Sequence, residues 1–315
     1  MKNALAVFSG KANPALARKV CECLNLTLGK VDSKTFPDGE LDVKVLEDVR
    51  GSDVYVIQPT CPPVNENLME LLILVDCLRR ASAERITAVI PYYGYARQDR
   101  KAEGRVPISA KLVANLVTAS GANRALSVDL HTAQIQGFFD IPMDHLYAAP
   151  VLVDYFRKLQ LADLTVVTPD VGGIKMARAY AKRLGAGLAI CDKRRSGPTQ
   201  TEVMHVIGDV QGRNVVLVDD MISTGNSIRD AAEACRKNGA RDIFICATHA
   251  VLAGNAIETL RKAPVKEIVI TDTIPLEKRE KIETLQNLRV LSIAPLLSEA
   301  IRRIHHSESV SSLFM

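Results

Sequence analysis

The chain has 315 residues, long enough for two α/β domains that each bury a core of their own. Hydrophobic residues make up 47% and charged residues 24%, as in an ordinary globular protein, and no apolar run is long enough to cross a bilayer. Aromatic residues reach only 4% with no tryptophan, which argues against the stacking platforms of single-stranded nucleic-acid binders. The net charge of +4 suits phosphate-bearing substrates but does not select them.

The cysteines and the N-terminus indicate the compartment. Seven cysteines are scattered, and only Cys21 and Cys23 lie close together, without the spacing of a metal site or a disulfide framework. Met1–Gly10 has too short an apolar run for a signal peptide. We therefore expect a soluble, cytoplasmic protein with reduced cysteines.

Strand-like and helix-like segments alternate through the first half. Asn13 and Pro14 are typical of a helix start, and the apolar stripe after Asn65 has the helical period. The expected strands are Ala4–Phe8, Leu41–Val45, Asp53–Gln58, Arg85–Pro91 and Arg124–Val128, and the expected helices are Asn13–Cys23, Asn65–Ala83 and Pro107–Ser120.

Three segments between these elements could bind a ligand. Phe36–Glu40 has turn chemistry, so it is either a plain hairpin loop or part of a site. Tyr92–Lys101 gathers three tyrosines and three cations after a strand, and its arginines could bind phosphates in bidentate fashion. Asp129 and His131 also follow a strand, where they suit a divalent metal or its bound water, although a lone histidine is more often structural.

The alternation restarts after Pro150, and Gln134–Pro142 is the segment expected to cross between domains. Strands alternating with helices predict parallel sheets with helices on both faces. We expect an N-terminal domain over 1–147 and a C-terminal domain over 148–315, with the final helix and tail able to pack back on the first domain. The second-half strands are Leu164–Thr168, Leu188–Cys191, Val203–Ile207, Val215–Val218, Asp242–Ala247, Glu267–Thr271 and Val290–Ile293, and the helices are Ile174–Leu184, Ile228–Cys235 and Pro295–Ile304.

The most informative stretch is Val215–Ser227. A buried strand leads into Asp219 and Asp220, then into a turn rich in hydroxyls and glycine, then into a helix. The start of a helix after a strand is where α/β proteins bind anions, so this turn is predicted to hold a phosphate. The alternative is that the aspartates merely end a strand and the hydroxyls merely cap a helix. It is not a Walker A loop, because that motif occurs nowhere in the chain.

Two further loops carry charge. Asp170 follows a strand and precedes Gly172 and Gly173, which makes a second element of the same kind. Asp192–Pro198 is cationic with no apolar anchor, so we expect either a mobile catalytic loop or a solvated surface loop.

Together these segments resemble the ribose-phosphate diphosphokinases (phosphoribosyl diphosphate synthetases), of class I. The resemblance runs nearly end to end. It rests on Phe36–Glu40, Asn67–Leu72, Leu78–Ser82, Pro91–Arg100, Val128–His131, Gln134–Phe139, Asp192–Arg195, the Val215–Ser227 stretch and the tail Ser309–Phe314.

The resemblance implies two phosphoribosyltransferase type I-like α/β domains. It also implies transfer of the β,γ-diphosphoryl group of ATP to the C1 hydroxyl of ribose 5-phosphate, giving 5-phospho-α-D-ribose 1-diphosphate and AMP. That product feeds nucleotide, histidine and tryptophan biosynthesis. The implied cofactor is Mg²⁺, the implied effectors are phosphate and ADP, and the implied assembly is a homohexamer.

The resemblance also assigns roles to residues. ATP would be bound by Phe36, Asp38, Gly39, Glu40, Arg97, Gln98, Asp99 and Arg100, the first four from an adjacent subunit. Ribose 5-phosphate would be bound by Arg195, Asp219, Asp220, Ser223, Thr224, Gly225, Asn226 and Ser227. Lys193 and Arg195 would be catalytic, and His131, Asp170 and Asp129 would hold the metal. The effector pocket would involve Arg50, Ser82, Arg105, Ser309, Ser311 and Phe314.

The chain departs from the family pattern in the phosphate turn. Ser223 stands where an aspartate is usual, and Asn226 and Ser227 stand where glycine or alanine with threonine is commoner. Thr132 replaces a more usual alanine or serine. Two other functions share parts of the pattern: a phosphoribosyltransferase shares the phosphate turn, and a catalytically silent regulator of this family lacks an uninterrupted catalytic loop.

Overall fold

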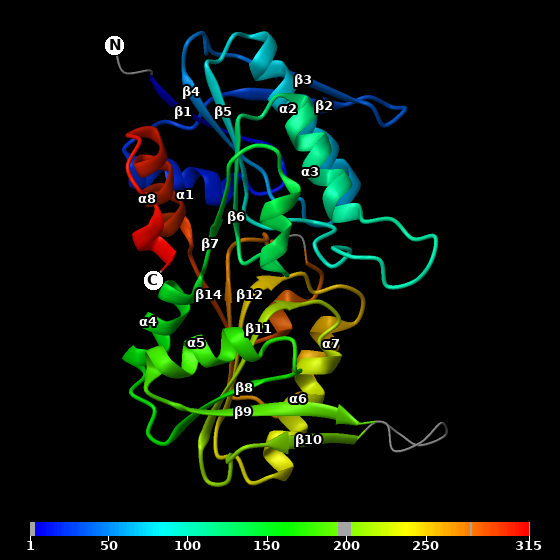
Figure 1. Ribbon diagram of the computed structural model, residues 1–315, viewed down its shortest axis with the longest axis vertical. Coiled ribbons are helices and arrows are strands. Elements are labelled where there is room, and N and C mark those ends of the chain that lie inside the picture. The colour runs from blue at the N-terminus through cyan, green and yellow to red at the C-terminus, as the bar shows by residue number, and fades with distance from the viewer. Residues whose placement is uncertain (1–3, 195–202, 278, 315) are drawn as a thin grey trace. The chain divides into compact units, whose positions relative to one another are not determined.

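The computed structural model describes residues 4–194, 203–277 and 279–314. The chain forms two compact units (Figure 1). Unit 1 contains Met1–Tyr147 together with Thr273–Pro275 and Ser292–Met315, and unit 2 contains Ala148–Asp272 with Leu276–Leu291. None of the helices in the part of the chain just given is long and apolar enough to span a membrane.

Unit 1 is built on a five-stranded sheet in which every neighbouring pair is parallel. Its strands read as nearly continuous apolar runs because both faces are covered by helices. The pair α1 and α8 lies on one side and the pair α2 and α3 on the other (Figure 1). In spatial order the strands are β1 (Leu5–Ser9), β4 (Asp53–Ile57), β5 (Arg85–Ile90), β6 (Arg124–Val128) and β7 (Met143–Leu146), and the helices are α1 (Pro14–Leu24), α2 (Val64–Arg80), α3 (Ser109–Ser120) and α8 (Ala294–His305).

Helix α8 is held to unit 1 by a buried carboxylate. Asp53, only 2% exposed, accepts a hydrogen bond at 2.7 Å from Arg85 Nε, and its other oxygen lies 2.8 Å from His305 Nδ1. Arg85 also donates to the carbonyl oxygen of Ile304 at 3.3 Å. Burial alone would raise the pKa of Asp53, but the hydrogen bonds from Arg85 and His305 outweigh it and lower the pKa.

A separate two-stranded antiparallel hairpin extends from unit 1, formed by β2 (Val31–Thr35) and β3 (Leu41–Val45). Its tip is the predicted turn. Gly39 adopts a φ of 94°, and its N–H donates to the carbonyl oxygen of Phe36 at 2.9 Å. Glycine is favoured there because an L side chain rarely adopts a positive φ.

Unit 2 is built on a seven-stranded sheet, mostly parallel, with α4 and α5 on one side and α6 and α7 on the other (Figure 1). The exception is the antiparallel pair of β9 and β10 at one edge. In spatial order the strands are β10 (Val203–Ile207), β9 (Gly187–Arg194), β8 (Leu164–Thr168), β11 (Asn214–Ile222), β12 (Ile243–Ala250), β13 (Glu267–Thr271) and β14 (Leu288–Leu291), and the helices are α4 (Ala149–Lys158), α5 (Ile174–Leu184), α6 (Asn226–Lys237) and α7 (Ala256–Lys262).

The α/β fold class predicted from the sequence is confirmed, with corrections to single elements. β7, α4 and α7 were not predicted, and Gln134–Pro142 was wrongly expected to cross between domains. Most of that segment is a 3₁₀ turn, Ala133–Phe138, and β7 follows it within the sheet of unit 1. The strand expected to end at Val218 continues to Ile222, because Met221 and Ile222 pair with His249 and Ala250 of the longer strand β12.

Candidate active site

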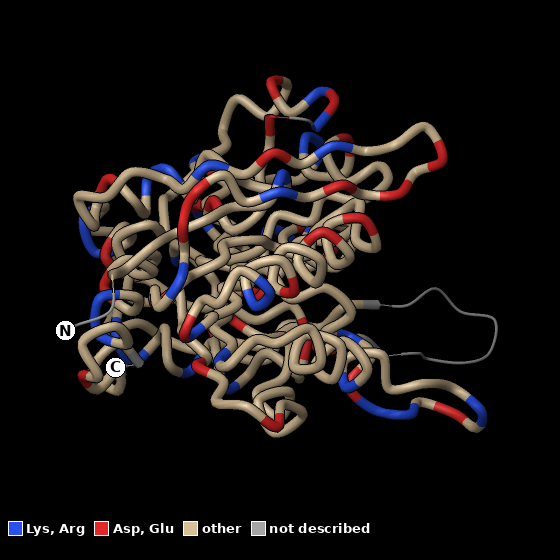
Figure 2. Tube along the Cα trace, turned by 90° about the horizontal axis from the view of Figure 1, so that it is seen from above, with Lys and Arg blue, Asp and Glu red and all other residues tan. Residues whose placement is uncertain are grey.

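The loop between β5 and α3 brings two unpaired arginines to the carboxyl end of the sheet in unit 1. Arg97 and Arg100 are both exposed, and neither forms an ion pair with any residue that the structure describes. The loop extends away from the body of unit 1, and cations predominate over acids along it (Figure 2). Unpaired guanidinium groups in this position can bind phosphates in bidentate fashion.

Gln98 and Asp99, between the two arginines, are bonded within unit 1. The side chain of Gln98 accepts a hydrogen bond from the hydroxyl of Ser109, and its carbonyl oxygen accepts one from the N–H of Ala110 at 3.2 Å. Asp99 Oδ2 accepts from Thr132 Oγ1 at 3.0 Å and from Gln134 Nε2 at 2.9 Å. These bonds fix the middle of the loop.

The next strand, β6, ends at Val128 and is followed by Asp129 and His131. Asp129 is 5% exposed with a φ of 40°, and its N–H donates to the carbonyl oxygen of Leu146 at 2.9 Å. The N–H of Leu130 donates to His145 Nε2 at 2.9 Å, so this ring nitrogen acts as an acceptor. His131 is exposed. Burial, and then the charge of Asp129, raise the pKa of Tyr147.

The hairpin tip of unit 1 presents Phe36, Asp38, Gly39 and Glu40. Phe36 is 50% exposed, which is unusual for a large apolar side chain, and both acids are exposed. The backbone bond between Phe36 N–H and the carbonyl oxygen of Glu40, at 2.8 Å, closes the tip.

In unit 2 the predicted phosphate turn connects β11 to α6. Ser223 is half-buried, whereas Thr224, Asn226 and Ser227 are exposed. Two bonds anchor the turn: the N–H groups of Leu252 and Ala253 donate to the carbonyl oxygens of Ile222 and Ser223 at 3.0 and 2.9 Å.

The helix that follows this turn starts without a side-chain cap. Gly225 is the N-cap residue with a φ of 78°, and no side chain accepts from the first turn of α6. The first N–H groups of a helix have no partner within it, and they carry partial positive charge. The turn therefore offers N–H groups and hydroxyls to an anion.

Three carboxyl groups lie on the same side of unit 2. Burial, the neighbouring Asp220 and the charge of Asp170 together raise the pKa of Asp219 to about 8. Asp220 is 8% exposed, and its N–H donates to Asp219 Oδ1 at 2.9 Å. Negative charge is therefore destabilised here, as expected for carboxylates that work with a cation or with sugar hydroxyls.

Asp170 begins a tight glycine turn before α5. Its Oδ1 accepts from the N–H of Gly173 at 3.0 Å, and its carbonyl oxygen accepts from Thr168 Oγ1 at 2.9 Å. A Cβ at Gly173 would lie 2.2 Å from Thr168 Oγ1, so a larger residue there would displace the Thr168 side chain. Asp170 itself is exposed.

The cationic loop is described only in part. Lys193 lies on β9, opposite Met204 of β10. Arg195 falls outside the described residues.

The residues predicted for the effector pocket form two contacts in unit 1. Arg50 Nη1 donates to Ser82 Oγ at 3.4 Å, and Ser82 has a φ of 65°. In the tail, the N–H of Ser311 donates to Ser309 Oγ at 3.2 Å, ahead of Phe314. Arg105 is exposed with a φ of 63°.

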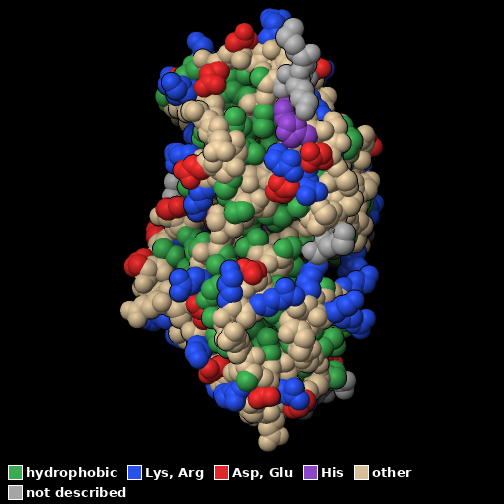
Figure 3. All heavy atoms as spheres, turned by 90° about the vertical axis from the view of Figure 1, so that its left-hand side faces the viewer, with side chains coloured by type: hydrophobic (Ala, Val, Ile, Leu, Met, Phe, Trp, Pro, Cys, Tyr) green, Lys and Arg blue, Asp and Glu red, His purple; other side chains and the backbone are tan. Residues whose placement is uncertain are grey.

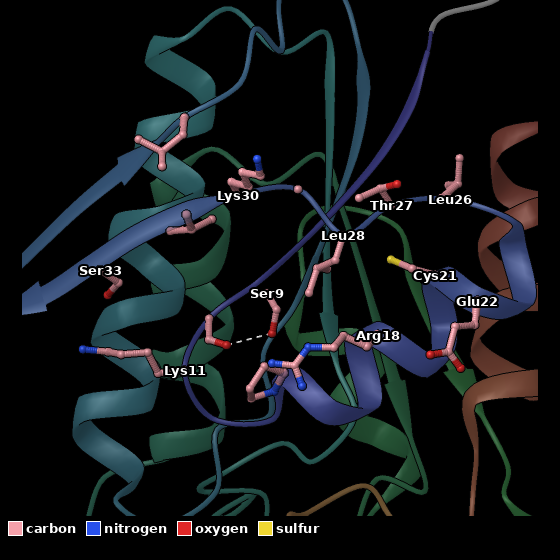
Figure 4. Close-up of a pocket in the computed structure, with 15 residues that line it drawn as sticks. Ser9, Lys11, Arg18, Cys21, Glu22, Leu26, Thr27, Leu28, Lys30 and Ser33 are labelled. Atoms are coloured by element: carbon pink, nitrogen blue, oxygen red, sulfur yellow. Dashed lines mark hydrogen bonds between the residues drawn. The ribbon is translucent and has the colours of Figure 1, made fainter.

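Two prominent surface features lie away from these residues. A pocket of about 790 Å³ opens in unit 1 beside α1 and the start of β2 (Figure 4), and no predicted site residue lines it. Arg18 extends across the pocket from α1 (Figure 4). Lysine and arginine side chains also gather over α4 and α5 of unit 2 (Figure 3), where they form an exposed helical surface. The candidate site therefore could not be located from the size of a pocket or from a concentration of cationic side chains.

The oxygen and nitrogen ligands of the candidate site are compatible with a magnesium ion. No group of three or more His, Cys, Asp or Glu suited to a metal occurs within 4–194, 203–277 and 279–314. Mg²⁺ is usually bound by one or two carboxylates, with waters and substrate phosphates completing the shell, so it does not need such a cluster.

The sequence did not single out Thr132 and Gln134 as site residues. A usable signal existed: both follow β6, the strand next to β5, and the carboxyl ends of neighbouring parallel strands meet at one edge of a sheet. Which polar side chains then bond across that edge depends on the loop conformations.

Comparisons with known proteins identify the family. Residues 5–121 match the N-terminal domain of ribose phosphate pyrophosphokinase, and residues 194–315 match the phosphoribosyl synthetase-associated domain. A ribose-phosphate pyrophosphokinase of Rhodopirellula baltica is 57% identical, covering 98% of both chains. One from Gloeobacter violaceus is 55% identical, covering 98% of this chain and 93% of the relative.

A solved structure is similar over almost the whole chain. The phosphoribosylpyrophosphate synthetase of Mycobacterium smegmatis has a TM-score of 0.90 at 43% identity, covering 97% of this chain and 100% of the other. The resemblance inferred from the motifs is thereby confirmed. The chain belongs to the ribose-phosphate pyrophosphokinases, a family of enzymes.

Proposed function

We propose that the chain transfers the diphosphoryl group of ATP to the C1 hydroxyl of ribose 5-phosphate. One observation carries the proposal: the same chain has a loop whose two arginines form no ion pair with a described residue, and an uncapped, hydroxyl-rich helix start. The first suits a polyphosphate and the second suits a phosphate monoester. The products are 5-phospho-α-D-ribose 1-diphosphate, which can supply nucleotide, histidine and tryptophan biosynthesis, and AMP.

On the ATP side, Arg97 and Arg100 bind the phosphates. Gln98 and Asp99 belong to the same loop, and their internal bonds restrict its conformations. Phe36, Asp38, Gly39 and Glu40 bind the adenine of ATP held by a neighbouring copy of the chain. The half-exposed ring of Phe36 supports this assignment, because a planar apolar side chain can stack on a base.

On the sugar side, the turn from Ser223 to Ser227 binds the 5-phosphate through hydroxyls and helix N–H groups. Asp219 and Asp220 accept hydrogen bonds from the ribose hydroxyls. Ser223 supplies a hydroxyl instead of a carboxylate, and this keeps a negative charge away from the phosphate.

The reaction forms a bond between the C1 oxygen and the β-phosphorus while the bond from that phosphorus to the α,β-bridging oxygen breaks. AMP leaves with the bridging oxygen, and the C1 hydroxyl loses its proton. Such transfers depend mainly on positioning and on neutralising charge in line. Lys193 and Arg195 supply positive charge to the transferred group.

Mg²⁺ is the proposed cofactor. His131, Asp129 and Asp170 are the residues proposed to hold it or its bound waters. When bound, the ion neutralises the charge of the ATP phosphates.

We also propose an effector site, a cellular compartment and an oligomeric state. Arg50, Ser82, Arg105, Ser309, Ser311 and Phe314 bind phosphate or ADP as effectors. The contact between Arg50 and Ser82 supports the first pair, since it holds a guanidinium beside a hydroxyl at the surface. The chain works in the cytoplasm as a homo-oligomer, a hexamer. Its seven free cysteines fit a reducing compartment.

The test is an assay of AMP formed from ATP and Mg²⁺ with and without ribose 5-phosphate. We expect AMP only when ribose 5-phosphate is present. A phosphoribosyltransferase or a silent regulator would release none, and that outcome in folded protein would exclude the proposal.

Lys193→Ala should lower kcat by about two to three orders of magnitude with little loss of ATP affinity, because its charge acts on the transition state. Lys182→Ala, an exposed lysine of α5, is the matched control and should leave kcat unchanged. Near-normal activity of Lys193→Ala would contradict the assignment.

A further inference from the structure

We propose that Thr132 and Gln134 are positioning residues for ATP, acting through the carboxylate of Asp99. The inference rests on the proposed function of the loop 97–100. It gives Asp99 a different role from its two neighbours: Arg97 and Arg100 touch the nucleotide, whereas Asp99 connects their loop to the segment after β6.

The Asp99 carboxylate links two neighbouring loops of unit 1. Oδ2 accepts two hydrogen bonds, from the Thr132 hydroxyl at 3.0 Å and from the Gln134 amide at 2.9 Å. Both donors come from the segment that follows β6, and Asp99 comes from the segment that follows β5. These strands are parallel neighbours, so the two bonds join adjacent loops at one edge of the sheet.

The two hydrogen bonds to Asp99 also affect the charge available to the neighbouring arginines. Asp99 is one residue from Arg100 and two from Arg97, yet it forms no ion pair with either in the described part of the chain. A carboxylate held by two uncharged donors is less available to a guanidinium group. These two hydrogen bonds, which we call the Asp99 bridge, therefore keep the carboxylate from pairing with Arg97 or Arg100. An incoming phosphate then does not have to displace an internal counter-ion.

The loop 97–100 is also held at Gln98. Gln98 is fixed on the other side by Ser109 and Ala110 at the start of α3. Gln98 and Asp99 are thus held at two separate places, and the arginines on either side project from a braced backbone. Pre-organisation of this kind raises affinity by lowering the ordering cost of binding.

Thr132 also connects the arginine loop to His131. Thr132 directly follows His131, so the same bridge fixes the relative placement of the arginine loop and of His131 within unit 1. ATP phosphates and the groups proposed to hold their cation must be aligned for in-line transfer. A threonine hydroxyl in the bridge supplies part of that alignment.

The experiment compares Thr132→Val, which removes the hydroxyl with little change in shape, with Thr132→Ser, which keeps it. Two properties are measured: the affinity for α,β-methylene-ATP, which cannot undergo the transfer, and the KM for each substrate. Thr132→Val should weaken binding of the analogue and raise the KM for ATP roughly tenfold, equivalent to about 1.4 kcal/mol, the size of a weak hydrogen bond to a charged group. Thr132→Ser should bind the analogue with wild-type affinity and keep the wild-type KM for ATP. Neither variant should change the KM for ribose 5-phosphate.

Two controls separate positioning from general loss of structure. Thr118→Val removes a hydroxyl that bonds only to the carbonyl oxygen of Ala114 within α3, and it should leave nucleotide binding unchanged. In a double-mutant cycle, Thr132→Val should add little to Asp99→Ala, because both break the same link.

The outcomes are distinct. Normal analogue binding by Thr132→Val together with weak binding by Asp99→Ala would overturn the proposal and make Asp99 a direct ATP ligand. Equal weakening by Thr132→Val and Thr132→Ser would also overturn it, because the hydroxyl would then be irrelevant. If the wild-type chain binds the analogue but releases no AMP with ribose 5-phosphate, the proposed reaction fails while the bridge can still be judged from binding.

Discussion

At the scale of single residues, Asp219 is proposed to bind the ribose hydroxyls, yet its negative charge destabilises the fold. Its pKa of about 8 reflects burial and two neighbouring carboxyl groups, against an ordinary value of 3.8. Between these pH values the folded chain holds a proton at Asp219 that the unfolded chain has lost. Stability therefore falls as the pH rises from about 4 to about 8.

Asp219→Asn should remove this dependence. We expect the variant to have a higher melting temperature than the wild type at pH 8 and a flatter profile between pH 5 and pH 8, measured by calorimetry in a chelating buffer. Each kcal/mol recovered should appear as about 2–4 °C. The variant should also lose affinity for ribose 5-phosphate.

The control for this prediction is Asp209→Asn, which alters an exposed acid of unit 2 paired with Arg213. Parallel pH profiles for Asp219→Asn and the wild type would show that Asp219 ionises normally in the folded chain.

At the scale of elements, the start of α6 depends on the conformation of Gly225. Its φ of 78° costs an L residue about 1–2 kcal/mol, whereas a Cβ there would meet its nearest neighbours at 3.5 Å, an ordinary contact. Gly225→Ala should therefore lower stability modestly and, by shifting the first turn of α6, raise the KM for ribose 5-phosphate by about tenfold or more.

Gly212→Ala is a matched control in the same unit. Gly212 has a φ of 67°, and nothing lies within 4 Å of a Cβ built there. Both variants should lose a similar amount of stability, measured by denaturant unfolding, but only Gly225→Ala should change the KM. An equal KM for both would mean that the turn does not bind the phosphate.

The same scale shows what sequence patterns can predict. The alternation of apolar runs with amphipathic stripes predicted most strands and helices, because buried parallel strands and helix faces have distinct periods. The end of β11 was misplaced because the polar pair Asp219 and Asp220 interrupts the apolar run, although the strand continues in register with β12. β7 and α7 are short and lack a strong pattern of their own.

At the scale of the whole chain, the two units are not simple consecutive segments. The last helix belongs to unit 1, where His305 contacts Asp53 across 252 residues of sequence. We expected that the final helix could pack back on the first domain, but no local pattern encodes its pairing of His305 with Asp53. The pKa of Asp219 and the bonds of Asp99 were equally unpredictable, because both depend on which loops meet in space.

The sequence predicted which loops form the candidate site but not the hydrogen bonds between them. Motif positions placed the arginines after β5, the acid and histidine after β6 and the phosphate turn after β11. Only the structure shows that the four residues of the loop 97–100 differ. Gln98 and Asp99 accept hydrogen bonds from Ser109, Thr132 and Gln134, whereas the two arginines form no ion pair with a described residue.

The central claim is that both distal phosphates of ATP move together to the sugar. ATP labelled separately at the α, β or γ phosphorus should be incubated with ribose 5-phosphate and Mg²⁺, and the products separated. The account predicts β and γ label in the sugar diphosphate and α label only in AMP. Label from the γ position alone in the sugar product, with ADP as the second product, would contradict it.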